Sequence, residues 1–337
     1  MKRLRWTLPK STMGWRGDFG SFVATLPRAV VAAGAATLPA VLGVYLNRVP
    51  LGFTASFGAY LVVITHPNPP AAGRARTLAV IVFLLSFGAV AGAASAMRVW
   101  AFVPLAVVCA TWQGWTEIAD NGLRLPAAMS VLALLLSASK RLSPDLAVLT
   151  YGAAFATGAV WQGLVQYIAA CRNGTPIAPP VVDSAALPTS IATAPRFIGT
   201  MAVLGFVGGA IAASLPVPHA GWLLTTALRV MKPTQAQTLF RLKQRFVGTI
   251  SGAVFATGLL CWPFPALLYA GTLGVMLTLM QLLGPRRYAM WTFCLTVIAL
   301  DLNGVRPQEI SWLLGEERIL LTIGGLALAI LFGLRLP

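Results

Sequence analysis

Long apolar runs recur along the chain, separated by short polar or proline-containing intervals. A helix that crosses a bilayer needs about 20 predominantly apolar residues, and several of these runs approach that length. The sequence therefore predicts an all-α polytopic transmembrane bundle of about 12 helices. The expected spans cover residues 29–46, 50–65, 77–97, 99–114, 125–139, 145–170, 197–215, 219–231, 246–262, 265–284, 288–303 and 319–335.

Composition narrows the class of protein further. Hydrophobic residues make up 57% of the 337 residues and charged residues only 10%, whereas soluble domains average about 25% charged residues. So few charges cannot cover the surface of a water-soluble globule of this size. A typical cytosolic enzyme, a disordered chain and a disulfide scaffold are therefore excluded.

One polar interval divides the chain. Residues 172–195 contain several prolines, serines and threonines, a composition typical of a linker. We therefore expect a first transmembrane half at 29–171, a cytoplasmic linker at 172–195 and a second transmembrane half at 196–337. Residues 1–28 are basic with interleaved aromatic side chains, which predicts an interfacial segment on the cytoplasmic face.

The distribution of positive charge favours a topology with both termini cytoplasmic. The net charge is +16, and this topology places nineteen of the 25 lysines and arginines on the cytoplasmic side, as the positive-inside rule expects. Such a distribution is typical of a membrane protein rather than of a nucleic-acid-binding protein. The expected outer loop 304–318 fits less well, because Glu309, Glu316, Glu317 and Arg318 make it unusually charged.

The sequence offers no pattern for metal, cofactor or enzymatic chemistry. The four cysteines lack metal or redox spacing, and His66 and His219 are far apart. A nucleophile elbow, a Walker loop and a Rossmann glycine pattern are also absent. We therefore predict a protein that is not an enzyme and that uses no metal and no cofactor.

Landmarks at the ends of the apolar runs recur at a nearly constant offset. Pro50 and Pro218 are 168 positions apart, and Arg76 and Arg245 are 169 positions apart. Because each half has an even number of spans, the two halves are expected to form six-helix parallel repeats about an axis along the membrane normal. The alternative is chance, since proline and arginine are common at helix ends.

The second span of each half is short and bounded by prolines. Residues 50–65 precede His66-Pro67, and residues 218–231 precede Lys232-Pro233. In transporters, short spans in corresponding positions point to the binding site, because a broken helix frees backbone groups and directs its dipole at a ligand. Two ordinary short helices would give the same pattern.

The most specific motif covers residues 221–252. It combines an aromatic-then-threonine span, a Pro-Thr turn and the pattern Arg-x-x-Gly-Thr-x-x-Gly, which begins at Arg245. The stretch resembles the fusaric acid resistance family of bacterial inner-membrane proteins, relatives of aromatic carboxylic acid efflux pumps. The resemblance covers residues 195–335 and implies a multi-pass exporter of the inner membrane. Leu321-Thr322 stands where the family often has Asp-Thr.

Five cations and no acid lie close together in this motif: Arg229, Lys232, Arg241, Lys243 and Arg245. Arg241 and Arg245 would share one face of a helix, and guanidinium groups bind carboxylates in a bidentate manner. The segment therefore predicts an intracellular vestibule for organic anions, with anionic lipid head groups as the alternative partner. Arg229 is the strongest candidate, because it lies within an apolar run, where charge is costly.

Four further positions complete the set of candidate residues. Trp222 is expected either to stack on an aromatic substrate or to belong to an interfacial aromatic belt. Asp301, at the edge of a span, is a candidate proton-coupling residue or else an interfacial helix cap. Gly248 and Gly252 are expected to allow close helix packing.

Together these features predict an inner-membrane transporter that exports small organic, in particular aromatic, carboxylic acids, driven by membrane potential or by a proton gradient. The alternatives are an organic-anion channel and a non-transporting scaffold that binds lipid or a partner protein. The expected partners are the organic-acid substrate and membrane lipids, without nucleic acid. A homo-oligomer or a periplasmic adaptor are further options.

Overall fold

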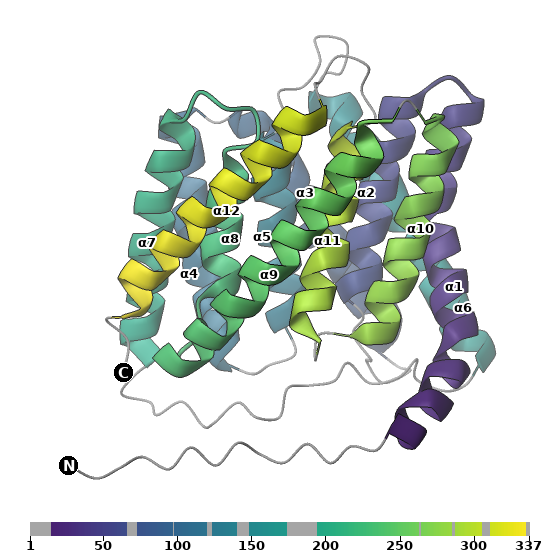
Figure 1. The fold of residues 1–337 in the computed structure, drawn as a ribbon, viewed down its shortest axis with the longest axis horizontal. Helices are drawn as coiled ribbons and strands as arrows, with labels where there is room; N and C mark the ends of the chain where they lie inside the picture. The colour runs from purple at the N-terminus through teal and green to yellow at the C-terminus, as the bar shows by residue number, and fades with distance from the viewer. Residues whose placement is uncertain are drawn as a thin grey trace.

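The computed structural model describes residues 15–65, 73–96, 98–119, 123–139, 148–173, 194–262, 264–284, 287–304 and 311–334. These ranges form twelve α-helices and no strand, which confirms the predicted helical bundle (Figure 1). The helices are α1 (Trp15–Tyr45), α2 (Val49–Thr65), α3 (Arg74–Ser95), α4 (Val99–Ala119), α5 (Arg124–Ser139), α6 (Val148–Asn173), α7 (Ala194–Ser214), α8 (Gly221–Val230), α9 (Gln235–Leu260), α10 (Ala266–Leu283), α11 (Tyr288–Gly304) and α12 (Ser311–Gly333).

Six of the described helices are long and apolar enough to cross a membrane: α1, α3, α4, α6, α7 and α10. Helices α2 and α8, with 17 and 10 residues, are shorter and almost completely buried among the others. Large apolar side chains such as Phe87, Phe206 and Leu331 are exposed instead. This distribution is expected of a bundle whose outer helices face lipid.

Two helices begin earlier than the hydropathy predicts. Helix α9 begins at Gln235 rather than near residue 246, and α12 begins at Ser311 rather than near residue 319. Arg245 therefore lies inside α9 instead of opening it, and Arg318 lies inside α12 instead of in an outer loop. Both arginines are fully buried. Each of these helices extends beyond the predicted apolar span, because a hydropathy profile does not include the charged residues at its start.

Other predicted boundaries fall partly outside the described residues. Helix α1 already begins at Trp15, so it includes part of the predicted interfacial segment 1–28. The predicted linker at 172–195 lies mostly outside the described ranges.

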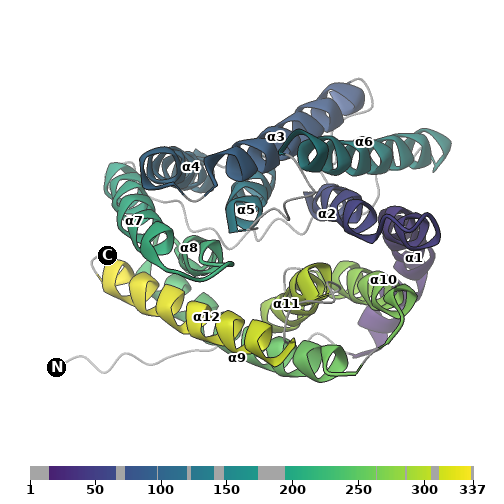
Figure 2. The same ribbon diagram turned by 90° about the horizontal axis from the view of Figure 1, so that it is seen from above.

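The two halves use the same helix contacts. In the first half α3 packs on α5 and α6, and in the second half the corresponding helix α9 packs on α11 and α12. Likewise, α2 packs on α1 and α6, and its counterpart α8 packs on α7 and α12. Between the halves, α4 contacts α7 and, reciprocally, α10 contacts α1. Figure 2 shows the two halves facing each other, with α2, α5, α8 and α11 on the inside. This arrangement is that of two like-oriented six-helix units.

Glycines bring parallel helices into contact in both halves. Gly88 and Gly92 of α3 face the backbone of α5, and a Cβ at Gly92 would collide with the carbonyl of Leu134. In the second half a Cβ at Gly248 would collide with the carbonyl of Ala289 in α11, and one at Gly252 would lie 2.8 Å from the carbonyl oxygen of Phe293. Close approach of α9 and α11 therefore requires glycine at these positions.

The turn between α8 and α9 is held by α4. The carbonyl of Leu228 accepts a hydrogen bond from Nε2 of Gln113 (3.1 Å), and Nζ of Lys232 lies 2.6 Å from Oε1 of Glu117. Glu117 also pairs with Arg124 at the start of α5. Burial lowers the pKa of Lys232 to about 8, and the negative charge of Glu117 counteracts this shift. Side chains from the first half thus fix the end of α8.

Replacing Gly248 with Ala should destabilise the protein by about 1–3 kcal/mol, because the added methyl group forces α9 and α11 apart. Thermal unfolding of the purified protein measures this loss. Gly258, also in α9, has open space around it, so Gly258→Ala is the matched control and should leave the melting temperature unchanged or slightly higher. Equal stability of the two variants would contradict the packing account.

Replacing Glu117 with Gln should also destabilise the protein, because it leaves Lys232 and Arg124 together without their shared acid. Breaking a buried ion pair costs about 3–5 kcal/mol, and we expect the lower end because Arg124 is 29% exposed. The melting temperature of Glu117→Gln is compared with that of Glu316→Gln, which alters an exposed acid. A Glu117→Gln variant as stable as this control would show that the ion pairs do not hold the turn.

Candidate anion-binding site

Buried guanidinium groups dominate the interior of the second half. Arg245 in α9 is 0% exposed and Arg318 in α12 is 1% exposed, while Arg229 at the end of α8 is half-buried. Within the described part of the chain, none of the three forms a salt bridge with an acid. Nε and Nη1 of Arg318 lack a hydrogen-bond partner there, and the polar neighbour of Arg245 is the hydroxyl group of Tyr288.

Such an arrangement is energetically costly without a ligand. An ionised group removed from water loses its hydration, and an unpaired buried charge is strongly unfavourable. Arginine cannot avoid this cost by losing its proton at ordinary pH. Buried arginines without an acidic partner are therefore candidates for binding an anion that enters from outside the protein.

One group of cations gathers where α8 ends and α9 begins. The guanidinium carbon of Arg241 lies 4.4 Å from the ring centroid of Tyr288, and that of Arg229 lies 5.6 Å from the ring centroid of Trp291. Arg245 lies within electrostatic range of Tyr288 as well. We call Arg229, Arg241 and Arg245 the inner arginine cluster; the aromatic rings beside it partly compensate the positive charge.

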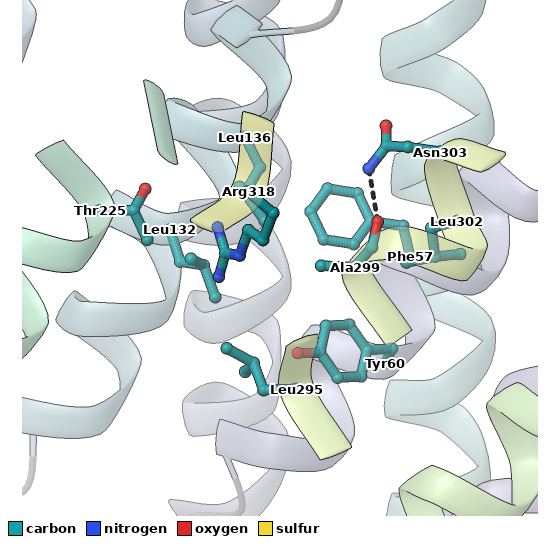
Figure 3. Close-up of a pocket in the computed structure, with 10 residues that line it drawn as sticks. All are labelled: Phe57, Tyr60, Leu132, Leu136, Thr225, Leu295, Ala299, Leu302, Asn303 and Arg318. Carbon is teal, nitrogen blue, oxygen red and sulfur yellow. Dashed lines mark hydrogen bonds between the residues drawn. The ribbon is translucent and has the colours of Figure 1, made fainter. Parts of the chain in front are cut away.

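A pocket lies further along the bundle, between the halves. Figure 3 shows the guanidinium of Arg318 and the rings of Phe57 and Tyr60 inside this central pocket. It leaves about 20 Å³ for the centres of water molecules, enough for one or two waters. The residues that line it are Phe57 and Tyr60 of α2, Leu132 and Leu136 of α5, Thr225 of α8, Leu295, Ala299, Leu302 and Asn303 of α11, and Arg318 of α12.

Tyr60 connects the pocket with the inner arginine cluster. Its side chain is 2% exposed and lies within electrostatic range of Arg229, Arg245 and Arg318. Buried hydroxyl groups of Thr225, Thr226, Thr249 and Thr292 also lack hydrogen-bond partners among the described groups. The interior therefore offers guanidinium and hydroxyl donors that have no partner in the described structure.

The two halves contribute different chemistry to the pocket. The four inner helices α2, α5, α8 and α11 correspond in pairs between the halves. The second half supplies the charged residue of the lining, Arg318, together with polar and aliphatic residues of α8 and α11. The first half supplies Phe57, Tyr60, Leu132 and Leu136, which form an apolar and aromatic wall. A ligand with one anionic end and an apolar body would match this asymmetry.

The structure separates the predicted vestibule residues into groups. Arg229, Arg241 and Arg245 lie together, whereas Lys232 is paired with Glu117 and serves the α8–α9 turn. Lys243 is exposed, in a position suited to lipid head groups or solvent.

The remaining predicted site residues lie apart from this cluster. Trp222 is buried against His219 and Arg318 and does not line the pocket. Asp301, in α11, is fully buried, and both of its carboxylate oxygens lack a partner in the described structure. It lies outside the pocket lining and near Tyr269, so its carboxylate is enclosed by the protein.

Several functional candidates were not predicted from the sequence. Arg318 was assigned to a loop because two acids precede it. Tyr60, Tyr288 and Trp291 stand singly in or beside apolar runs, where an aromatic residue is ordinary. The threonines carry no charge and give no periodic signal. No cluster of metal-binding side chains occurs among the residues that the structure describes.

Comparison with known proteins supports the resemblance drawn from the sequence. Residues 204–332 match a family model described as fusaric acid resistance protein-like. An uncharacterised protein of Synechocystis is 31% identical over 132 residues, which are 39% of this chain and 17% of that relative. The chain thus matches only about a sixth of the relative's length. No solved structure matches.

The family match includes α8, α9, α11 and most of α12, the helices that carry all three unpaired arginines. The similarity and the buried charge therefore coincide in the second half of the chain. Over residues 204–332 this multi-pass membrane protein is similar to the fusaric acid resistance protein-like family.

Proposed function

We propose that the protein moves small organic anions across the membrane. The observation that carries this proposal is that the buried Arg245 and Arg318 and the half-buried Arg229 lie within electrostatic range of Tyr60 and form no salt bridge with an acid in the described residues. The family to which residues 204–332 are similar is associated with efflux and transport. Two guanidinium groups in one apolar interior repel each other, and a carboxylate that binds between or beside them removes this repulsion.

The preferred ligand in this proposal is a carboxylate with an apolar or aromatic body. The inner arginine cluster attracts the anion at the α8–α9 end, and Tyr60 and the free threonine hydroxyls offer hydrogen bonds along the way. At the central pocket Arg318 binds the carboxylate while Phe57 and the leucines of α5 contact the body. Because apolar side chains contact the body of the ligand, the pocket should prefer benzoate-like acids to small inorganic anions.

The narrow pocket favours a carrier over an open channel. Space for one or two waters does not admit an organic acid, so transport requires the halves to move relative to each other. The paired contacts of α4 with α7 and of α1 with α10 are the main interfaces at which such movement would occur. Single-channel recordings from reconstituted protein separate the two mechanisms, since a carrier gives no unitary currents.

The orientation and the driving force belong to the same proposal. Helix α1 begins and α12 ends at the same end of the bundle (Figure 1), in accord with two cytoplasmic termini in a bacterial inner membrane. The inner arginine cluster then faces the cytoplasm. An anion that leaves a negative-inside cell gains about 2.3 kcal/mol per charge per 100 mV, so membrane potential alone favours export. Asp301 is the candidate if protons contribute.

Replacing Arg245 and Arg318 together with Gln should lower transport of labelled benzoate at least about tenfold, because a lost charge-assisted hydrogen bond costs about 1.5–3 kcal/mol. Uptake into inverted membrane vesicles measures this effect. Arg76→Gln, at an exposed position of α3, is the control and should transport normally.

Two outcomes would contradict the proposal. One is unchanged benzoate uptake by an Arg245→Gln, Arg318→Gln variant that is inserted in the membrane in normal amount. The other is a wild-type protein that transports no member of a panel of organic acids while binding anionic lipid, which would favour the scaffold. Loss of uptake in the Arg76→Gln control would show that the assay reports general damage.

A further inference from the structure

Four side chains form a continuous stack beside the central pocket. One carboxylate oxygen of Glu317 accepts the backbone N–H of His219 (2.8 Å), and the other lies 3.0 Å from Nδ1 of its ring. The His219 ring stacks on Trp222 with centroids 4.4 Å apart and planes 16° apart. The guanidinium carbon of Arg318 lies 4.8 Å from the Trp222 ring centroid. We call these four residues the α8–α12 stack.

Trp222 has no open ring surface for a ligand. The side chain is 1% exposed, its ring is covered by His219 and Arg318, and it does not line the central pocket. Direct stacking of an aromatic substrate on this ring would require the stack to come apart. The geometry therefore argues for a role that acts through Arg318.

Arg318, in contrast, reaches the pocket. It lines the cavity (Figure 3), and its Nε and Nη1 atoms have no hydrogen-bond partner in the described structure. The cation–π contact with Trp222 leaves these two N–H donors unoccupied. The indole ring can therefore hold the guanidinium in place while the two donors remain free to bind a carboxylate.

We propose that Trp222 is a positioning residue, which holds the Arg318 guanidinium so that its free N–H donors bind the carboxylate of an organic anion when movement of the two halves widens the central pocket. His219 and Glu317 brace the indole ring, and Glu317 is the chain neighbour of Arg318 in α12. Holding a long side chain in its binding orientation removes an entropic cost that each binding event would otherwise carry. The inference rests on the proposed function, because its ligand is the transported anion.

The test is a double-mutant cycle on benzoate binding, measured by titration calorimetry on the purified full chain. Trp222→Leu should weaken binding about tenfold, in line with the strength of a buried cation–π contact. Trp222→Phe keeps an aromatic face and should stay within about threefold of wild type. In an Arg318→Gln background, Trp222→Leu should cause no further loss, because the two residues act as one unit.

The bracing acid gives a second, milder test with a matched control. Glu317→Gln should weaken benzoate binding about two- to threefold, because the hydrogen bonds to His219 become weaker without the charge. Glu316→Gln changes the exposed neighbouring acid and should bind like wild type. Trp262→Leu, at a ring that is 66% exposed, controls for loss of a tryptophan as such.

The outcomes separate this role from the proposed function. If the loss of binding free energy in the double variant equals the sum of the losses from Trp222→Leu and Arg318→Gln, Trp222 contacts the ligand itself. This result would overturn the positioning role but leave the proposed function intact. A wild-type protein that binds no acid of the panel would overturn the proposed function and this role with it. If Trp222→Leu does not fold, the double-mutant cycle is run with Glu317→Gln instead. The loss of benzoate affinity that Glu317→Gln causes must then disappear in the Arg318→Gln background.

Discussion

An unpaired positive charge in an apolar interior is the constraint on which the structure depends. The described residues hold two kinds of cation: Lys232 and Arg124 share Glu117 and stabilise a turn, whereas Arg245 and Arg318 have no acid partner. Charge of the second kind is costly, and aromatic faces beside it partly compensate this cost. The aromatic contacts of Tyr288, Trp291 and Trp222 are arranged accordingly.

The repeat explains where this charge can be placed. Two like-oriented units that meet through reciprocal contacts leave α2, α5, α8 and α11 enclosed between them, away from lipid. A symmetric pocket would carry the same chemistry on both walls. Here Arg318 comes from the second half and the aromatic rings of Phe57 and Tyr60 come from the first half, while both halves supply aliphatic residues, so the pocket is asymmetric although the helix arrangement repeats.

The sequence predicted the helices well because the membrane leaves few alternatives to a long apolar helix. The predicted spans begin after the true starts of α9 and α12. Arg245 and Arg318 interrupt the apolar pattern there, and a hydropathy profile does not distinguish a buried charge from a loop. The motif around Arg245 pointed to the inner arginine cluster, but nothing local marked Tyr60 or Arg318. Their roles arise from packing between helices that are distant in the sequence.

The most direct test of the unpaired charge is the thermal stability of the purified protein with and without benzoate. Benzoate should raise the melting temperature of the wild type, and uncharged benzyl alcohol should not. The melting temperature of an Arg245→Leu, Arg318→Leu variant should not change with benzoate. Without ligand, this variant should be at least as stable as the wild type, because apolar groups replace buried unpaired charges. A wild type insensitive to benzoate, together with a markedly less stable variant, would show that the arginines stabilise the fold and bind no anion.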